Sequence, residues 1–238
     1  MTIDGNLAAA SAMAALEKRL EVATSNLAGV QKAGYQWRQA VTRTVSSAFE
    51  SELGLPPSLV RTDVKTSFAP GMPVANANPL SLALKSEGFF EVTGKDGPLY
   101  TRNGDFVVAT DGTLTTRQGF EVVAASGRLK ADPSGGPVAM NALGELSQAG
   151  RALGRVNVVT FDTPERLEAV SDTMFRAPES LRPDPVAAPE AVAGHLERPV
   201  QGVIDGLIEM VSVQRAYEAA QRAARAIDDA SMNRIRQS

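Results

Sequence analysis

The chain has 238 residues, of which 43% are hydrophobic and 21% charged, and its formal net charge is -3. This length is sufficient for one or two domains with a substantial core, and no block of Lys and Arg indicates a nucleic-acid binder. The lack of cysteine excludes disulfides, thiolate metal sites and cysteine nucleophiles. No run of about 18 apolar residues occurs, so we expect no insertion into a membrane.

The first predicted element is an alanine-rich helix over about residues 3–31. Its apolar residues recur at steps of three and four, which is typical of a coiled-coil seam: Met13, Leu16, Leu20, Ala23, Leu27 and Val30. Gly34 follows, where a left-handed residue commonly closes a helix. Residues 7–16 resemble a secretory signal, but Asp4 precedes them without any Lys or Arg, so we expect no cleavage.

The middle of the chain is predicted to be extended and then rich in β-strands. Residues 37–78 lack clear periodicity and contain proline turns at 55–57 and 70–73, which is typical of an extended linker. Over residues 79–177, short runs of alternating apolar residues predict an antiparallel β domain. The turns between these runs are Asp96-Gly97, Asn103-Gly104, Asp111-Gly112 and Gln118-Gly119. Residues 178–198 are rich in Pro, Ala and Glu and are predicted to form an exposed return connection.

The last predicted element is a long helix over residues 199–235, with Pro199 in its first turn. We expect its inward stripe to comprise Val203, Leu207, Met210, Tyr217, Ala220, Ala224 and Ile227, with polar Gln214 inside the seam. Gly202 and Gly206 favour either close helix packing or local flexibility.

Such a long helix needs a partner, because one narrow stripe buries too little apolar surface to order so many residues. The predicted fold is therefore mixed α and β. Residues 1–36 and 199–238 pair as a coiled-coil-like helical layer, and the antiparallel all-β middle domain lies between them in sequence. The alternative is that both helices cover an ordinary globular core.

The sequence offers no residue pattern typical of an enzyme or a metal site. His195 is the single histidine and falls in the predicted return connection. Asp96, Asp105 and Asp111 do not have the spacing of a calcium loop, and residues 134–137 do not match a phosphate-binding loop. We therefore predict no catalytic, cofactor-binding or metal-binding residues and no small-molecule substrate. Trp37 is expected to pack within its own chain.

Several short motifs follow one another along the chain in a fixed order. They are a Ser-Asn-Leu-Ala-Gly-Val run and a Gly-Tyr pair near the start, a Gly-Phe-Phe strand start, a Tyr-Thr-Arg-x-Gly-x-Phe hairpin, an Asp-Gly turn and an Arg-Ala-Tyr-Glu run. Their key residues are Asn26, Gly34, Gly88, Phe89, Phe90, Tyr100, Thr101, Arg102, Gly104, Phe106, Asp111, Gly112, Arg215, Tyr217 and Glu218. This order resembles the flagellar basal-body rod protein family, and the length fits a proximal rod subunit best and a distal one next. The run Glu197-Arg198-Pro199-Val200 departs from the family pattern where the last helix starts.

The resemblance implies a non-enzymatic structural subunit of the periplasmic rod, which transmits torque. Its implied partners are other copies of itself, neighbouring rod proteins and the flagellar type III export apparatus, with export occurring without a cleaved signal peptide. The expected assembly interface comprises Met13, Leu16, Leu20, Leu27, Val30, Val203, Leu207, Met210, Gln214, Tyr217 and Ala224. The alternatives are a distal rod or hook-like axial filament subunit, and a β-rich enzyme with helical ends, which would need titratable groups gathered in a pocket.

Overall fold

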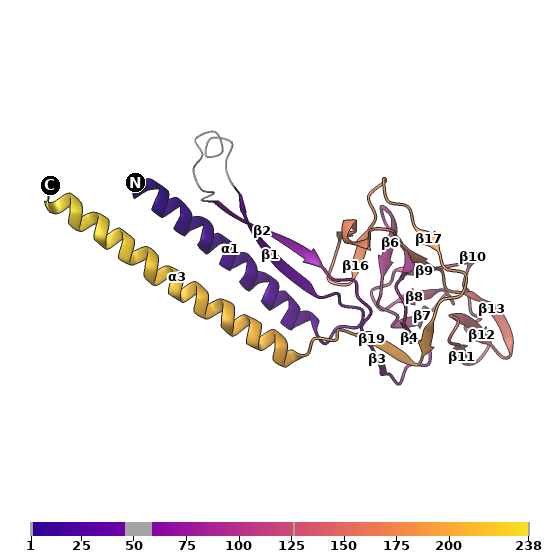
Figure 1. The fold of residues 1–238 in the computed structure, drawn as a ribbon. Coiled ribbons are helices and arrows are strands. Elements are labelled where there is room, and N and C mark those ends of the chain that lie inside the picture. The colour runs from indigo at the N-terminus through magenta and orange to yellow at the C-terminus, as the bar shows by residue number, and fades with distance from the viewer. Residues whose placement is uncertain (1, 46–58, 126, 238) are drawn as a thin grey trace. The chain divides into compact units, whose positions relative to one another are not determined.

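The computed structural model describes residues 2–45, 59–125 and 127–237 (Figure 1). The chain divides into two compact units. The helical unit comprises residues 1–28, 38–66 and 201–238, and the β unit comprises residues 29–37 and 67–200. Both units are therefore discontinuous in sequence, and the chain passes between them after residues 28, 37, 66 and 200.

The described part of the helical unit contains α1 (Thr2–Gly29), α3 (Val203–Gln237) and the strands β1 (Arg38–Val45) and β2 (Leu59–Thr66). The two helices lie side by side and run in opposite directions (Figure 1). The two strands pair antiparallel, from Arg38 opposite Thr66 to Val45 opposite Leu59. No helix among the described residues is long and apolar enough to cross a membrane.

The predicted linker over residues 37–78 differs from the structure, because β1 and β2 form a regular ribbon there. Both strands carry β-branched residues, and the Thr42 and Thr62 hydroxyls lie 3.2 Å apart across the ladder. Neither strand buries one face completely, so its sequence lacks the apolar alternation that predicts a strand. The proline turn expected at residues 55–57 lies outside the described residues.

The β unit is built from short strands that pair only antiparallel. The strands are β3 (Met72–Ala75), β4 (Leu82–Leu84), β5 (Phe89–Gly94), β6 (Gly97–Thr101), β7 (Phe106–Val108), β8 (Leu114–Thr116), β9 (Glu121–Ala124), β10 (Gly127–Arg128), β11 (Val138–Met140), β12 (Glu145–Gln148), β13 (Arg151–Arg155), β14 (Val158–Thr160), β15 (Glu168–Ala169), β16 (Met174–Arg176), β17 (Asp184–Pro185), β18 (Ala191–Ala193) and β19 (His195–Arg198). One short 3-10 helix, Pro164–Arg166, precedes β15.

The largest sheet has the strand order β15-β16-β6-β5-β9-β8-β7, and β14 pairs with β5 and with β17. Smaller sheets are β11-β12-β13, β18-β4 and β19-β3. The predicted antiparallel β middle is therefore confirmed.

Two neighbouring phenylalanines on β5 supply two separate cores. Successive side chains of a strand point to opposite faces, so Phe89 and Phe90 diverge. Phe90 packs edge-on against Phe106, with ring centroids 5.1 Å apart, inside the larger cluster. Phe89 packs against Phe161 at 5.8 Å in the second cluster, together with Tyr100.

Three of the four predicted turns join paired strands. Asp96-Gly97 lies between β5 and β6, Asp111-Gly112 between β7 and β8, and Gln118-Gly119 between β8 and β9. The fourth prediction, a hairpin turn at Asn103-Gly104, is wrong, because β6 pairs with β5 and β16 whereas β7 pairs with β8. Gly104 instead permits close approach, since a Cβ there would lie 1.8 Å from the Leu82 carbonyl oxygen.

The predicted return connection over residues 178–198 is also different in the structure. β17, β18 and β19 pair with β14, β4 and β3 respectively. His195 accordingly lies in a strand opposite Ala75 rather than in a loop, with its Nδ1 2.9 Å from the Ala193 carbonyl oxygen. These strands are two to four residues long, which is too short to show a period in sequence.

Candidate assembly interface

The helical unit is a candidate surface for binding other subunits, because two paired helices bury few side chains against each other. The Tyr217 hydroxyl donates to Glu17 Oε1 at 3.0 Å, which joins α3 to α1. Gly206 faces Leu27 of α1, where an added Cβ would lie 3.5 Å from Leu27 Cδ1. Of the two glycines considered for close packing, Gly206 is therefore the one that contacts another helix, while Gly202 is exposed.

The inward stripe of α3 is shifted from the predicted one. Val213, which is not part of the predicted stripe, is 1% exposed, whereas Gln214, predicted in the seam, is exposed. The observed stripe contains Gly206, Met210, Val213, Tyr217, Ala220 and Ala224, all buried or half-buried, at alternating steps of four and three. Val203 and Leu207, also predicted in the interface, are exposed, so they are free to contact a neighbouring molecule.

On the first helix, the predicted interface residues are partly covered. Met13, Leu16, Leu20 and Leu27 are half-buried in α1, and Val30 is buried in the segment that follows it.

The start of α3 differs from the prediction that placed Pro199 in its first turn. The helix begins at Val203, and the Asp205 carboxylate accepts a hydrogen bond from the Gly202 N–H at 2.8 Å. This is one half of a capping box, in which an acidic side chain in the first turn reaches back to the residue before the helix. The run at 197–200 departs from the family pattern, but the helix is still capped. The cap is at Gly202, three residues after Pro199.

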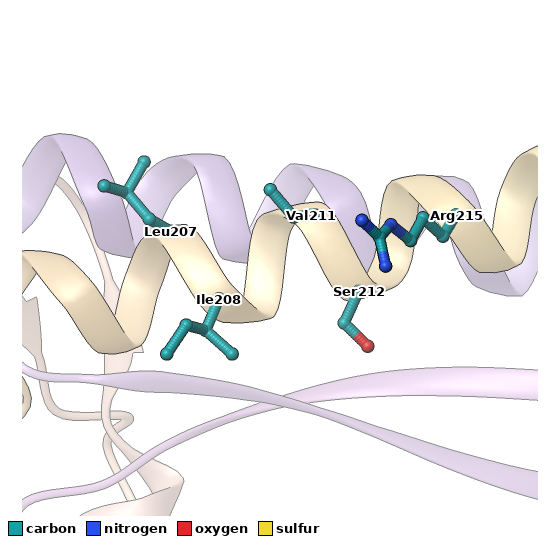
Figure 2. Close-up of a pocket in the computed structure, with 5 residues that line it drawn as sticks. All are labelled: Leu207, Ile208, Val211, Ser212 and Arg215. Carbon is teal, nitrogen blue, oxygen red and sulfur yellow. The ribbon is translucent and has the colours of Figure 1, made fainter.

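One side of α3 carries a row of exposed apolar residues, which we call the apolar face of α3. Its members are Val203, Ile204, Leu207, Ile208 and Val211. Ile204 is 72% exposed and Ile208 is 64% exposed, far more than core residues of this type. Figure 2 shows Leu207, Ile208 and Val211 with Ser212 and Arg215 around a hollow on this helix. Contiguous apolar surface of this kind marks an interaction site.

A second group of predicted residues lies inside the β unit, around the buried side chain of Arg102. Its Nε donates to both carboxylate oxygens of Glu197, at 2.9 and 2.8 Å. Nη1 donates to the Gly88 carbonyl at 2.7 Å and Nη2 to the Ser86 carbonyl at 3.2 Å. Arg102, Gly34 and Gly88 are among the motif residues recognisable in the sequence, whereas Glu197 has no predicted role. A charged arginine within a β domain would have been the signal, since a buried guanidinium requires an acidic partner.

The remaining motif residues hold the strands or lie on the helices. Thr101 Oγ1 donates to the Thr173 carbonyl at 2.6 Å, and burial, aided by nearby Glu91, raises the pKa of the Tyr100 hydroxyl. On α3, Tyr217 is half-buried while Arg215 and Glu218 are exposed. Within the described ranges, no group of three His, Asp or Glu side chains is placed to hold a metal ion.

Comparison with known proteins agrees with this arrangement. Residues 83–148, which span β5 to β12 and most of the main sheet, match the family model described as the flagellar hook protein FlgE/F/G D1 domain. This part of the β unit is therefore similar to that D1 domain.

Two relatives extend the likeness over most of the chain. The flagellar basal-body rod protein FlgF of Caulobacter vibrioides is 29% identical over 209 residues, covering 86% of this chain and 85% of the relative. The protein of the same name from Mesorhizobium japonicum is 26% identical over 228 residues, covering 90% and 89%. The chain is therefore similar, over most of its length, to flagellar basal-body rod proteins, which are structural proteins rather than enzymes.

Proposed function

We propose that this protein is a structural subunit of the flagellar basal-body rod and that it polymerises through its terminal helices. The observation that carries the proposal is the apolar face of α3, which holds five aliphatic side chains in water. Burying one such side chain stabilises by about 1.5–3 kcal/mol, so covering this face with a neighbouring helix favours association. The likeness to two rod proteins named FlgF supports the same assignment.

The mechanism we propose is that assembly completes a helix ordering that is only partial in the free subunit. Among the α3 residues whose burial is described, Val213 has the only apolar side chain that is fully buried. Isolated helices are marginal in water and gain most of their stability from packing. Pairing of α1 and α3 in a coiled-coil-like layer is therefore completed by contacts to copies of this chain and to neighbouring rod proteins. Export through the flagellar type III apparatus without cleavage, and a place in the proximal part of the periplasmic rod, belong to the same proposal.

The substitution Ile208→Glu tests this function by placing a charge in the middle of the apolar face of α3. Because Ile208 is already exposed, the monomer should unfold at an unchanged denaturant concentration. In a strain that lacks the chromosomal copy, we expect the variant to be absent from purified basal bodies and the cells not to swim. Val170→Glu, an exposed valine in the β unit, is the matched control and should assemble normally. Normal incorporation of Ile208→Glu would contradict the proposal.

A second candidate is a distal rod or hook-like axial subunit. The matched family model covers hook and rod proteins together, which favours keeping this position as an alternative. Cryo-imaging of isolated basal bodies with this subunit labelled distinguishes the two, since the label lies in either the proximal or the distal part.

A further inference from the structure

We propose that the ion pair between Arg102 and Glu197 is a clamp for the segments by which the chain enters and leaves the β unit. We further propose that the subunit needs this clamp to be built into a rod, and this second part rests on the function proposed above. The pair lies deep in the β unit, where the two side chains are 1% and 2% exposed.

The Arg102 guanidinium donates hydrogen bonds to four acceptor atoms. Two are the Glu197 carboxylate oxygens, and two are the carbonyl oxygens of Ser86 and Gly88 in the loop before β5. A planar guanidinium bonded in this way has a fixed orientation, so it also fixes the position of Glu197. The pair therefore defines one point in the β unit to which other segments are attached.

Glu197 contacts the segments by which the chain enters and leaves the β unit, which we call the crossing segments. Its carboxylate accepts from the Gly71 N–H at 2.8 Å, and its backbone carbonyl accepts from the Gly34 N–H at 2.9 Å. The adjacent Arg198 guanidinium donates to the Gln31 carbonyl. Residues 29–37, 67–71 and 197–200, which include the β-unit side of every crossing, are thus joined through two neighbouring residues.

These segments also pack without room for additional atoms. A Cβ added at Gly71 would lie 2.2 Å from the Arg198 carbonyl oxygen, and one added at Gly34 would lie 2.2 Å from the Asn103 backbone nitrogen. No buried residue of either hydrophobic cluster belongs to this group, although half-buried Phe68 of segment 67–71 packs against Phe89 of the second cluster. Loss of the clamp should therefore loosen the crossing segments while the clustered core stays folded.

The test is a double substitution, Arg102→Met with Glu197→Leu, in the full chain. Apolar residues of similar volume leave no lone buried charge, but they remove the bonds to Gly71, Ser86 and Gly88. Residue-resolved amide exchange should show the Gly71 and Gly34 amides exchanging at least ~10-fold faster relative to the Phe90 and Val92 amides in the same sample. Arg117→Met is the matched control, because that arginine side chain is 61% exposed and its exchange ratios should stay unchanged.

The same double variant should be at least ~10-fold depleted from purified basal bodies relative to the unmodified chain. Equal acceleration of core and crossing amides, unchanged exchange, or normal incorporation would each overturn the clamp. If the double variant does not fold, Glu197→Gln is judged by the same exchange ratio. Absence of the unmodified chain from basal bodies would instead remove the proposed function, while the exchange ratio would still decide whether the clamp exists.

Discussion

The side-chain amide of Asn26 is bonded twice to the backbone of Arg38. Its Nδ2 donates to the Arg38 carbonyl at 2.8 Å, and its Oδ1 accepts from the Arg38 N–H at 3.0 Å. Asn26 lies fully buried in α1, and Arg38 is the first residue of β1. A single amide supplies both a donor and an acceptor, so it attaches the start of the ribbon to the helix.

Asn26→Ala should lower the free energy of unfolding by about 1–3 kcal/mol, because it leaves both backbone groups of Arg38 without this partner. Urea unfolding of the monomer followed by circular dichroism measures the change. Thr24→Ala is the control, since its exposed hydroxyl bonds only to the Leu20 carbonyl of the same helix. That change should stay within about 0.5 kcal/mol. Equal effects of the two substitutions would contradict the role of Asn26.

Gly34→Ala and Gly119→Ala separate backbone conformation from close packing. Both glycines adopt the left-handed region, with φ of +68° and +86°, so each substitution costs about 1–2 kcal/mol on that ground. A Cβ at Gly34 also collides with Asn103, whereas the space around Gly119 is open. Gly34→Ala should therefore destabilise by about 1–3 kcal/mol more, which thermal unfolding measures. Equal losses would show that the space around Gly34 is not restrictive.

Val213→Ala and Gln214→Ala test which residue of α3 faces α1. Val213 is buried, so losing its methyl groups should lower the free energy of unfolding by about 1–2 kcal/mol. Gln214 is exposed, and its truncation should change stability by less than about 0.5 kcal/mol. Denaturant unfolding of the two variants compares them directly. The reverse order of effects would restore the stripe predicted from the sequence.

Asp111 should give the β7–β8 turn a dependence on acid pH. Hydrogen bonds from the Thr113 backbone N–H, then from its hydroxyl, hold the pKa of the Asp111 carboxyl below its ordinary value of 3.8. Because the folded pKa is the lower one, this stabilisation is present above about pH 4 and is lost as the pH falls through the folded pKa.

Thr113→Val removes only the hydroxyl bond and should raise the pKa part of the way toward 3.8, measured by carboxyl carbon NMR. Thr115→Val, two residues after Thr113 in the same hairpin, serves as the control and should leave the Asp111 pKa unchanged. No shift in the Thr113→Val protein would show that the backbone bond acts alone.

The elements that the sequence predicts well are those with local causes. Helix periodicity gives α1 and most of α3, and glycines at Gly112 and Gly119 mark hairpins because the turns need φ above zero. What the sequence does not reveal depends on distant pairing. The β1–β2 ribbon has no buried face to create a pattern, and β18 and β19 are defined by partners more than about 100 residues earlier, at β4 and β3.

The candidate sites likewise combine features with local causes and features that depend on residues distant in sequence. The apolar residues of the helices are visible in sequence, but whether Val213 or Gln214 faces inward depends on a rotation of about 100° per residue, which the partner helix decides. Arg102 and Gly34 belong to recognisable motifs, yet Glu197 is 95 positions from Arg102, so no local signal joins them. Only the folded chain shows that these residues form one cluster.

The hydrogen bond between Glu17 and Tyr217 joins residues 200 positions apart. During translation α1 therefore leaves the ribosome long before the helix that partners it has been made, whereas the β unit is complete by residue 200. A newly made chain therefore has a complete β unit, and a first helix without its partner, until the last residues have been synthesised.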